Sequence, residues 1–239
     1  MRLDLRLVEA GLVRSRHQAQ AAIAAGRVRV NGRLATKSAQ VLASSDRFTL
    51  TNEPWVSRGA HKLLGALDDL EIQVPERCLD AGASTGGFTQ VLLSRGAKHV
   101  YAVDVGHGQL APEIAGDARV TALEGRHVND LSLTDLDGLP VGLAVADLSF
   151  ISLTLVLARL LSCVSPDGSA LLLVKPQFEV GRGAVPSSGV VRDEQARRSA
   201  VDSVARAGAD LGWKESWRGE SHLPGTRGNI EYFLWLQPV

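Results

Sequence analysis

Residues 77–104 read RCLDAGASTGGFTQVLLSRGAKHVYAVD, and this stretch decides the fold. An aliphatic strand ends near Asp80, and a glycine-rich turn over residues 81–88 leads into a helix. A second strand, residues 99–103, follows that helix and ends at Asp104. The order strand, turn, helix, strand predicts a parallel α/β unit in which the turn lies at the carboxyl edge of the sheet.

The alternation of strands and helices continues through the rest of the chain. A segment order of this kind predicts a doubly wound α/β sandwich with a Rossmann-like sheet. We expect helices at about 60–70, 152–164 and 193–211, and strands at about 120–123, 141–146, 170–174, 213–221 and 231–236.

The composition of the 239 residues is that of a soluble globular protein, because 45% are hydrophobic and few are aromatic. The most apolar region, residues 141–161, is interrupted by Asp147 and Arg159, so no stretch of about eighteen apolar residues is left to span a membrane. The N-terminus lacks the apolar segment of a signal peptide. Cys78 and Cys163 have no CxxC spacing, which argues against a disulfide framework and a zinc site. We therefore expect a cytoplasmic protein with no membrane contact and no metal.

The net charge of zero conceals two oppositely charged parts. Residues 1–60 contain ten Lys and Arg against four Asp and Glu, a net charge of +6, and residues 61–239 carry −6. A basic segment of this size favours binding to a polyanion. The alternative is that its arginines only make a small helical cap soluble.

The basic part has the pattern of two short helices and a strand pair. The first helix is expected to end at Gly11, and Ser15 is a candidate N-cap for a second helix that Gly26 would end. Asn31-Gly32 predicts a tight turn between two strands, because both positions tolerate positive φ. The apolar residues expected on one face of the first helix are Leu3, Leu5, Leu7, Val8 and Leu12.

These patterns divide the chain into three parts. Residues 1–53 form the basic module, residues 54–59 a linker, and residues 60–239 the α/β body. Pro54 disfavours a helix at the residue before it, and Gly59 permits a bend before the next helix.

The glycine-rich turn and Asp104 predict a nucleoside-containing ligand at the carboxyl edge of the sheet. Helix N-termini offer free N–H groups there, and an acidic residue at the end of the next strand commonly holds ribose hydroxyls. The turn lacks the second glycine of the dinucleotide fingerprint, so S-adenosylmethionine is favoured over a dinucleotide. A connector that binds no ligand is the third interpretation. The expected cofactor contacts are Asp80, Gly82, Ala83, Ser84, Thr85, Gly86, Gly87, Phe88, Asp104 and Asp147.

Four ionisable residues in separate segments are candidates for chemistry: Lys62, Asp147, Lys175 and Glu231. Lysine occurs only five times in the chain, and unlike arginine it can give up its proton in a protein. Asp147 follows one apolar strand and Lys175 ends another, so both side chains should project into the same crevice. Taken singly, each residue could instead be an ordinary ion-pair partner.

The N-terminal pattern resembles the S4 RNA-binding domain over about fifty residues, from RLDLRLVEAGLVRSRHQAQAAIAAGRVRVNGR to DRFTL. Arginine pairs well with phosphate through its planar fork, and folded RNA is recognised by shape. The resemblance implies that the partner is structured RNA, namely ribosomal RNA or ribosomal subunits. The expected RNA-binding residues are Arg2, Arg6, Arg14, Arg16, Arg27, Arg29, Arg33, Lys37 and Arg58.

The chain also resembles the TlyA family of rRNA 2'-O-methyltransferases in six motifs that occur in family order, VSRGAHKL, DAGASTGGF, ADLSFISL, VKPQFEVG, GVVRD and GNIEY. The resemblance implies a class I, FtsJ-like methyltransferase sandwich behind an S4 domain, and S-adenosylmethionine-dependent methylation of cytidine ribose in ribosomal RNA. It places the catalytic tetrad at Lys62, Asp147, Lys175 and Glu231. One departure is RHVND at residues 126–130, where an Arg-Thr-Asn-like segment is expected. A non-catalytic ribosome-assembly factor and a membrane-active haemolysin are the alternative functions.

The mechanism that this resemblance suggests centres on Lys175 as the general base for a ribose 2'-hydroxyl. Burial and a second cation, Lys62, would favour the neutral amine that a base requires. Asp147 would lie nearest the methyl-sulfonium, and Glu231 would position a lysine or the ribose. We expect the transfer of the methyl group from the sulfonium to this hydroxyl to need no metal.

Overall fold

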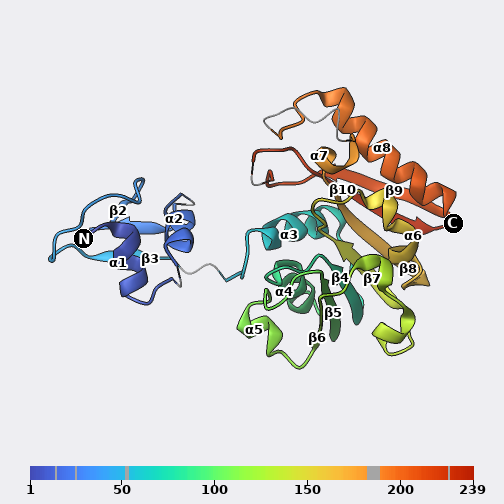
Figure 1. Ribbon diagram of the computed structural model, residues 1–239, viewed down its shortest axis with the longest axis horizontal. Helices are drawn as coiled ribbons and strands as arrows, with labels where there is room; N and C mark the ends of the chain where they lie inside the picture. Colours follow the sequence, from blue (N-terminus) through green and yellow to red (C-terminus); the bar gives the residue numbers. More distant parts are fainter. Residues whose placement is uncertain (14, 25, 52–53, 182–188, 226) are drawn as a thin grey trace. The chain divides into compact units, whose positions relative to one another are not determined.

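The computed structural model describes the chain apart from residues 14, 25, 52–53, 182–188 and 226. The chain forms two compact units, which we name the N-terminal unit (Met1–Pro54) and the C-terminal unit (Trp55–Val239) (Figure 1). Residues 55–59, which we expected to form most of a linker, belong to the C-terminal unit. There the backbone N–H of Val56 donates to Gln90 Oε1 at 2.8 Å.

The N-terminal unit packs two short helices against a small antiparallel sheet with the order β2-β1-β3. Leu3 and Leu7 are fully buried, because residues four apart lie on the same face of a helix. Leu5 and Leu12, which we expected on that face, are exposed, since Leu5 lies on the other side of the first helix and Leu12 follows its end. The elements are α1 (Leu3–Glu9), α2 (Arg16–Ala24), β1 (Val28–Val30), β2 (Arg33–Leu34) and β3 (Phe48–Leu50).

Local signals in the N-terminal unit act where the sequence predicted them. Ser15 Oγ accepts a hydrogen bond from the N–H of Gln18 at 3.2 Å and so caps the start of α2. Asn31 and Gly32 take φ values of 48° and 77° in the turn between β1 and β2. The predicted α+β architecture of this part is confirmed.

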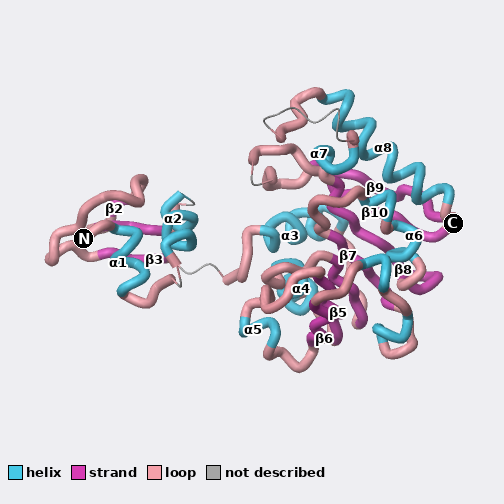
Figure 2. Tube along the Cα trace, viewed as in Figure 1, coloured by secondary structure: helices cyan, strands magenta, loops and turns pink. Residues whose placement is uncertain are grey.

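The C-terminal unit is a seven-stranded sheet with helices on both faces (Figures 1 and 2). The strand order is β6-β5-β4-β7-β8-β10-β9; the strands from β6 to β8 run parallel, and β10 runs antiparallel between β8 and β9. The elements are α3 (Gly59–Leu70), β4 (Arg77–Ala81), α4 (Gly87–Ser94), β5 (His99–Asp104), α5 (Pro112–Ala115), β6 (Val120–Glu124), the 3-10 helices η1 (Val128–Asp130) and η2 (Leu133–Leu136), β7 (Val141–Ala146), the 3-10 helix η3 (Leu153–Leu155), α6 (Leu157–Leu161), β8 (Val164–Val174), α7 (Pro176–Glu179), α8 (Glu194–Asp210), β9 (Trp213–Glu220) and β10 (Tyr232–Pro238).

Two hydrophobic cores cover the two faces of this sheet. Along β7, Leu143 and Val145 pack in the core that includes α3 and α4, whereas Ala144 and Ala146 pack in the core that includes α6 and α8. This division follows from the strand geometry, because successive side chains point to opposite faces. The predicted doubly wound α/β sandwich is therefore confirmed.

The structure differs from the expectation between β7 and β8. The helix expected over residues 152–164 is broken into η3 and α6, with Val156 between them at φ −117°. The strand expected at 170–174 begins earlier, at Val164, and its pairing with β7 skips residues 165–168. These four residues, Ser-Pro-Asp-Gly, have the composition of a turn, which hid the first part of the strand.

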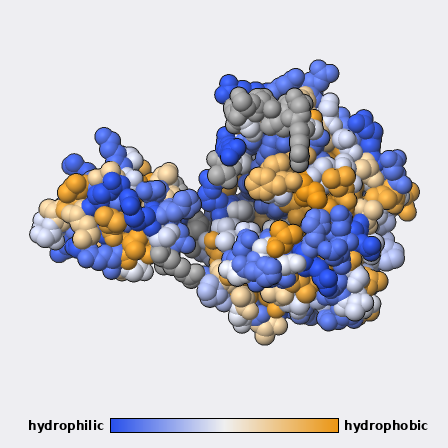
Figure 3. Space-filling model, in the orientation of Figure 1, coloured by the Kyte–Doolittle hydropathy of each residue, from blue (hydrophilic) through white to orange (hydrophobic). Residues whose placement is uncertain are grey.

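The described helices do not include one with the length and apolar character that a membrane span requires. Hydrophobic side chains nevertheless gather on the visible face of the C-terminal unit, between more hydrophilic areas (Figure 3). The large apolar residues that are exposed in this unit include Phe150, Leu155 and Leu139.

Candidate active site

A tight turn joins β4 to α4 at the carboxyl edge of the sheet. Gly82 takes φ 85°, and a Cβ at this position would lie 2.6 Å from the carbonyl oxygen of Asp147. Gly87 begins α4, and a Cβ there would lie 2.1 Å from Ser57 Oγ. Gly82 requires glycine, because its φ is positive and a side chain would collide with backbone; at Gly87 a side chain would displace Ser57.

Asp104 holds this turn from the end of β5. Its Oδ2 accepts a hydrogen bond from the N–H of Ser84, and its Oδ1 accepts one from the N–H of Gly106, both at 2.8 Å. A carboxylate has further lone pairs, so Asp104 remains able to accept hydrogen bonds from a ligand. It lines a cavity of about 540 Å³ that extends past Gln109 to His127.

A neighbouring cavity of about 360 Å³ contains the candidate catalytic residues. The two cavities share Gly82, Ser84, Asp147 and Ser149, so together they follow the turn from Asp104 into the second cavity. The sequence-predicted residues that line this second cavity are Arg58, Lys62, Gly82, Ala83, Ser84, Thr85, Gly87, Phe88, Asp147, Lys175 and Glu231.

Asp80 lies beneath the turn and lines neither cavity, in contrast to the expectation that it contacts a cofactor. Its Oδ2 accepts a hydrogen bond from Thr89 Oγ1 at 2.6 Å, and its Oδ1 is buried without a hydrogen-bond partner among the described residues. Burial, with a smaller contribution from the charge of Asp147, raises the pKa of Asp80 to about 7. Gly86, with φ 92°, also lies outside both linings.

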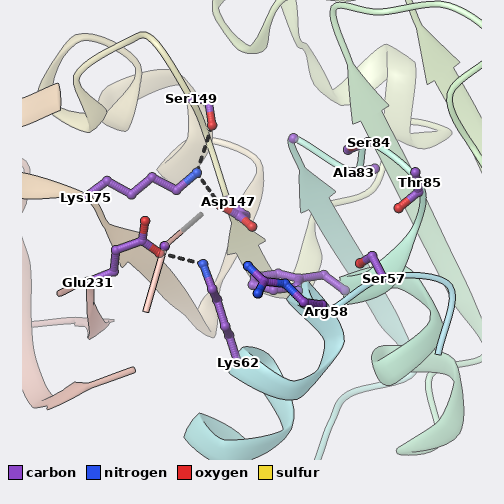
Figure 4. A pocket seen from close by; sticks show the side chains of 15 residues that line it. Ser57, Arg58, Lys62, Ala83, Ser84, Thr85, Asp147, Ser149, Lys175 and Glu231 are labelled. Atoms are coloured by element: carbon purple, nitrogen blue, oxygen red, sulfur yellow. Dashed lines mark hydrogen bonds and ion pairs between the residues drawn. The ribbon is translucent and has the colours of Figure 1, made fainter. Parts of the chain in front are cut away.

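The four candidate catalytic residues form two ion pairs in the lining of the second cavity (Figure 4). Lys175 Nζ lies 2.6 Å from Asp147 Oδ1 and donates a hydrogen bond to Ser149 Oγ at 2.8 Å. Lys62 Nζ lies 2.5 Å from Glu231 Oε2. Lys62 and Lys175 are only 9% and 8% exposed, so both ammonium groups are largely removed from water.

The sheet topology explains why residues so far apart in sequence meet. Asp147 and Lys175 directly follow β7 and β8, which are parallel neighbours, so both lie at the same edge. Glu231 directly precedes β10, which runs antiparallel to β8 and pairs Tyr232 with Val174. The start of β10 therefore meets the end of β8, and the first turn of α3 brings Lys62 to the same place.

Comparison with known proteins identifies the family. The pattern of FtsJ-like methyltransferases matches residues 55–238, and the pattern of the S4 domain matches residues 1–48. The Mycobacterium tuberculosis 16S/23S rRNA (cytidine-2'-O)-methyltransferase TlyA is 52% identical over 240 residues, which cover 99% of this chain and 89% of the relative. The chain belongs to the TlyA family of FtsJ-like methyltransferases.

Two further proteins that are similar to this chain carry a different name. Hemolysin A of Brachyspira hyodysenteriae is 38% identical over 234 residues, which cover 97% of this chain and 98% of the relative. A solved Streptococcus thermophilus protein that is also named as a hemolysin is 35% identical, with a TM-score of 0.79 over 100% of this chain and 88% of its own.

The basic residues predicted to bind RNA have several different surroundings. Arg2 and Arg16 pair with the buried carboxylate of Asp4, at 2.9 and 3.3 Å, and the pair with Arg16 also connects α1 to α2. Arg33 and Lys37 are exposed. The other predicted residues are Arg6, which pairs with Glu9; Arg29, which donates to Gly32 O; Arg27, which is half-buried; Arg58, which lines the second cavity; and Arg14, which lies outside the described residues.

Three residues that the structure adds to the site had not been predicted. Ser149 contacts Lys175 and stands two positions after Asp147, so its place in the motif ADLSF was a usable signal. Ser57 packs against Gly87, and Phe150 is 91% exposed and lines the first cavity; both lie in family motifs, VSRGAHKL and ADLSFISL, but nothing in their residue type singled them out. Among the described residues, no group of three or more His, Cys, Asp and Glu side chains is arranged to hold a metal ion.

Proposed function

We propose that this protein transfers a methyl group from S-adenosylmethionine to the ribose 2'-oxygen of a cytidine in ribosomal RNA, with Lys175 as the general base. The observation that carries the proposal is the position of the Lys175 amine. It contacts Asp147 and Ser149, two residues that also line the cavity along the glycine-rich turn. The candidate base and the cavity along the glycine-rich turn therefore share one wall.

The residues along the turn fit S-adenosylmethionine, which when bound supplies an electrophilic methyl group on a sulfonium centre. Asp104 offers carboxylate oxygens suited to ribose hydroxyls. Gly82 and the turn after it allow a ligand to approach the backbone closely. Asp147 offers negative charge to a cation in the shared part of the two cavities.

Lys175 can act as a base only as a neutral amine, and its surroundings control that state. Asp147 Oδ1 lies at ion-pair distance from this amine. A cationic ligand beside Asp147 competes with the amine for the same carboxylate and thereby weakens the pair. Lys62 is neutralised by Glu231, which leaves this second lysine to orient a hydroxyl rather than to accept its proton.

The N-terminal unit and the relatives support ribosomal RNA as the substrate. The N-terminal unit contains nine Lys and Arg against four Asp and Glu, a net charge of +5, and arginine forms two parallel hydrogen bonds with phosphate. The M. tuberculosis relative, at 52% identity, is named as a methyltransferase of cytidine ribose in 16S and 23S rRNA. We therefore assign the same substrate class to this chain, with the N-terminal unit as an RNA-binding module.

The test is methyl transfer from labelled S-adenosylmethionine to ribosomal subunits by Lys175→Ala and Lys175→Arg. Both substitutions should lower turnover by about 10²–10⁴-fold, the usual contribution of a general base, because arginine keeps the charge but cannot take up a proton. Lys214→Ala is the matched control, since Lys214 is exposed on β9. Cofactor affinity and thermal unfolding should show that each variant remains folded. Near-native turnover in Lys175→Ala would remove Lys175 from the role of base.

A further inference from the structure

Two segments lie side by side at the carboxyl edge of the sheet and are joined by three separate contacts. Residues 147–153 follow β7, and residues 175–179 follow its parallel neighbour β8. At one end of the two segments, Lys175 contacts Asp147 and Ser149. In the middle, the ring centroids of Phe150 and Phe178 are 5.3 Å apart. At the far end, the carboxylate of Glu179 contacts the start of η3.

The third contact uses both oxygens of Glu179. Its Oε2 accepts a hydrogen bond from Ser152 Oγ at 2.5 Å, and its Oε1 accepts one from the backbone N–H of Leu153 at 2.8 Å. No ion pair reaches this carboxylate from the described residues. Burial raises the pKa of Glu179, which shows that the surroundings disfavour the charge. The two carboxylate oxygens accept hydrogen bonds from two donors of the loop, and this explains why a carboxylate is found at this position although burial disfavours its charge.

The loop that Glu179 contacts has a strained backbone. Phe150 takes φ 66°, in the left-handed region that a bulky residue rarely adopts. Its side chain is 91% exposed, so burial of the ring does not compensate for the strain. Such a conformation persists only when contacts on both sides hold it. Those contacts are Ser149 with Lys175 on one side, and Ser152 and Leu153 with Glu179 on the other.

We propose that Glu179 is a positioning residue for methyl transfer: it anchors the far end of the strained loop and thereby keeps Asp147 and Ser149 in contact with Lys175. Glu179 does not touch the cavities along the turn, so its effect reaches the site through the loop. This inference rests on the proposed function of Lys175. The anchoring itself is a property of the fold and can be measured without methyl transfer.

The first experiment compares Glu179→Ala with Glu194→Ala, a substitution of an exposed carboxylate on α8. Turnover with ribosomal subunits should fall at least tenfold in Glu179→Ala, while the Kd for S-adenosylmethionine, measured by calorimetry, stays within about twofold. Hydrogen exchange at the amide of Leu153 should become at least tenfold faster in Glu179→Ala only. Unchanged exchange at Leu153, or a loss of cofactor affinity as large as the loss of turnover, would overturn the proposal.

A double-mutant cycle separates positioning from general support of the fold. Asn adopts positive φ much more readily than Phe, so Phe150→Asn relieves the strain that Glu179 is proposed to hold. The effect of Phe150→Asn alone on turnover does not enter the comparison. Glu179→Ala should lower turnover at least tenfold in the wild-type background but less than about threefold in the Phe150→Asn background. The same fold loss in both backgrounds would mean that Glu179 does not act through the strained loop.

The outcomes also distinguish this inference from the proposed function. If Lys175→Ala keeps native turnover, the base assignment fails, and Leu153 exchange still tests whether Glu179 anchors the loop. If Lys175→Ala is inactive and Glu179→Ala is native in turnover and exchange, the base assignment stands and the positioning role is wrong. Glu179→Gln should recover most of the turnover, because an amide at this position can accept from Leu153 and donate to Ser152.

Discussion

The buried pair between Lys62 and Glu231 makes a strong prediction about stability. Glu231→Gln preserves the shape of the side chain but removes its charge, which leaves the Lys62 ammonium without its partner 2.5 Å away. Lys62 is 9% exposed and Glu231 3% exposed, so water replaces only a small part of the lost interaction. The opposite side of the carboxylate is closed as well, because a Cβ on Gly225 would lie 2.3 Å from Glu231 Oε1.

The expected loss follows from these contacts. Removing one partner of a buried ion pair costs about 3–5 kcal/mol, because the remaining charge stays buried and unpaired. For a unit of this size, about 1 kcal/mol corresponds to roughly 2–4 °C in the melting temperature, so Glu231→Gln should lower it by about 6–20 °C. The double variant Lys62→Met, Glu231→Gln should recover most of the loss, since no buried charge then remains.

Tryptophan fluorescence during urea denaturation is a suitable assay, because all four Trp residues lie in the C-terminal unit. Glu220→Gln, on the exposed edge of β9, is the matched control and should change the free energy of unfolding by less than about 0.5 kcal/mol. The reasoning is refuted if Glu231→Gln loses less than about 1 kcal/mol, or if the double variant is no more stable than the single one.

Three further predictions concern pH and salt. Because burial raises the pKa of Asp80 to about 7, the folded protein holds a proton that the unfolded chain releases near pH 4, and stability falls as the pH rises through this window. Asp80→Asn should therefore be more stable than the wild type by up to about 4 kcal/mol at pH 8 and little different at pH 4, by the same fluorescence assay; equal differences at both pH values would contradict this. Hydrogen bonding by Arg2 holds the pKa of Asp4 well below its usual range, so Asp4 stabilises the N-terminal unit above about pH 4 and loses that contribution as the pH falls. Asp4→Asn should speed hydrogen exchange in α1 and α2 at pH 7, with a difference that shrinks below pH 4; a constant difference would rule out the ion pair as its source. Removing Arg33 and Lys37 together by alanine should weaken RNA binding and lower the slope of log affinity against log salt by about 1 for each phosphate that is no longer neutralised, and an unchanged slope would exclude both residues from the interface.

Much of the fold was readable from local sequence because each element carries its own signal. The turn at residues 81–88, the Asn31-Gly32 turn and the aliphatic strands each depend on neighbouring residues only, and the structure has them where they were expected. The break between η3 and α6 was not predicted. The apolar periodicity of the sequence continues across this break. The first residues of β8 were also missed, because their amino-acid composition is that of a turn.

The candidate site divides in a similar way. The sequence predicted that Asp147 and Lys175 would share one edge, because each directly follows a strand of a parallel sheet. It did not predict that Lys175 pairs with Asp147 and Lys62 with Glu231, since either lysine could match either carboxylate by charge. Asp80 is a comparable case, because its position before the turn resembles a ligand contact and its side chain is buried beneath the turn.

The sequence by itself determined the kinds of elements, the glycine-rich turn, the separation of charge and the identity of the ionisable residues, because these depend on local chemistry and spacing. Only the tertiary structure decided which charges pair, which carboxylate is buried and how Glu179 supports a loop whose nearest residue is 26 positions away in the chain. The physical reason is that pairing and burial are set by the strand order β4-β7-β8-β10, in which β10 comes from the end of the chain and runs against its neighbours.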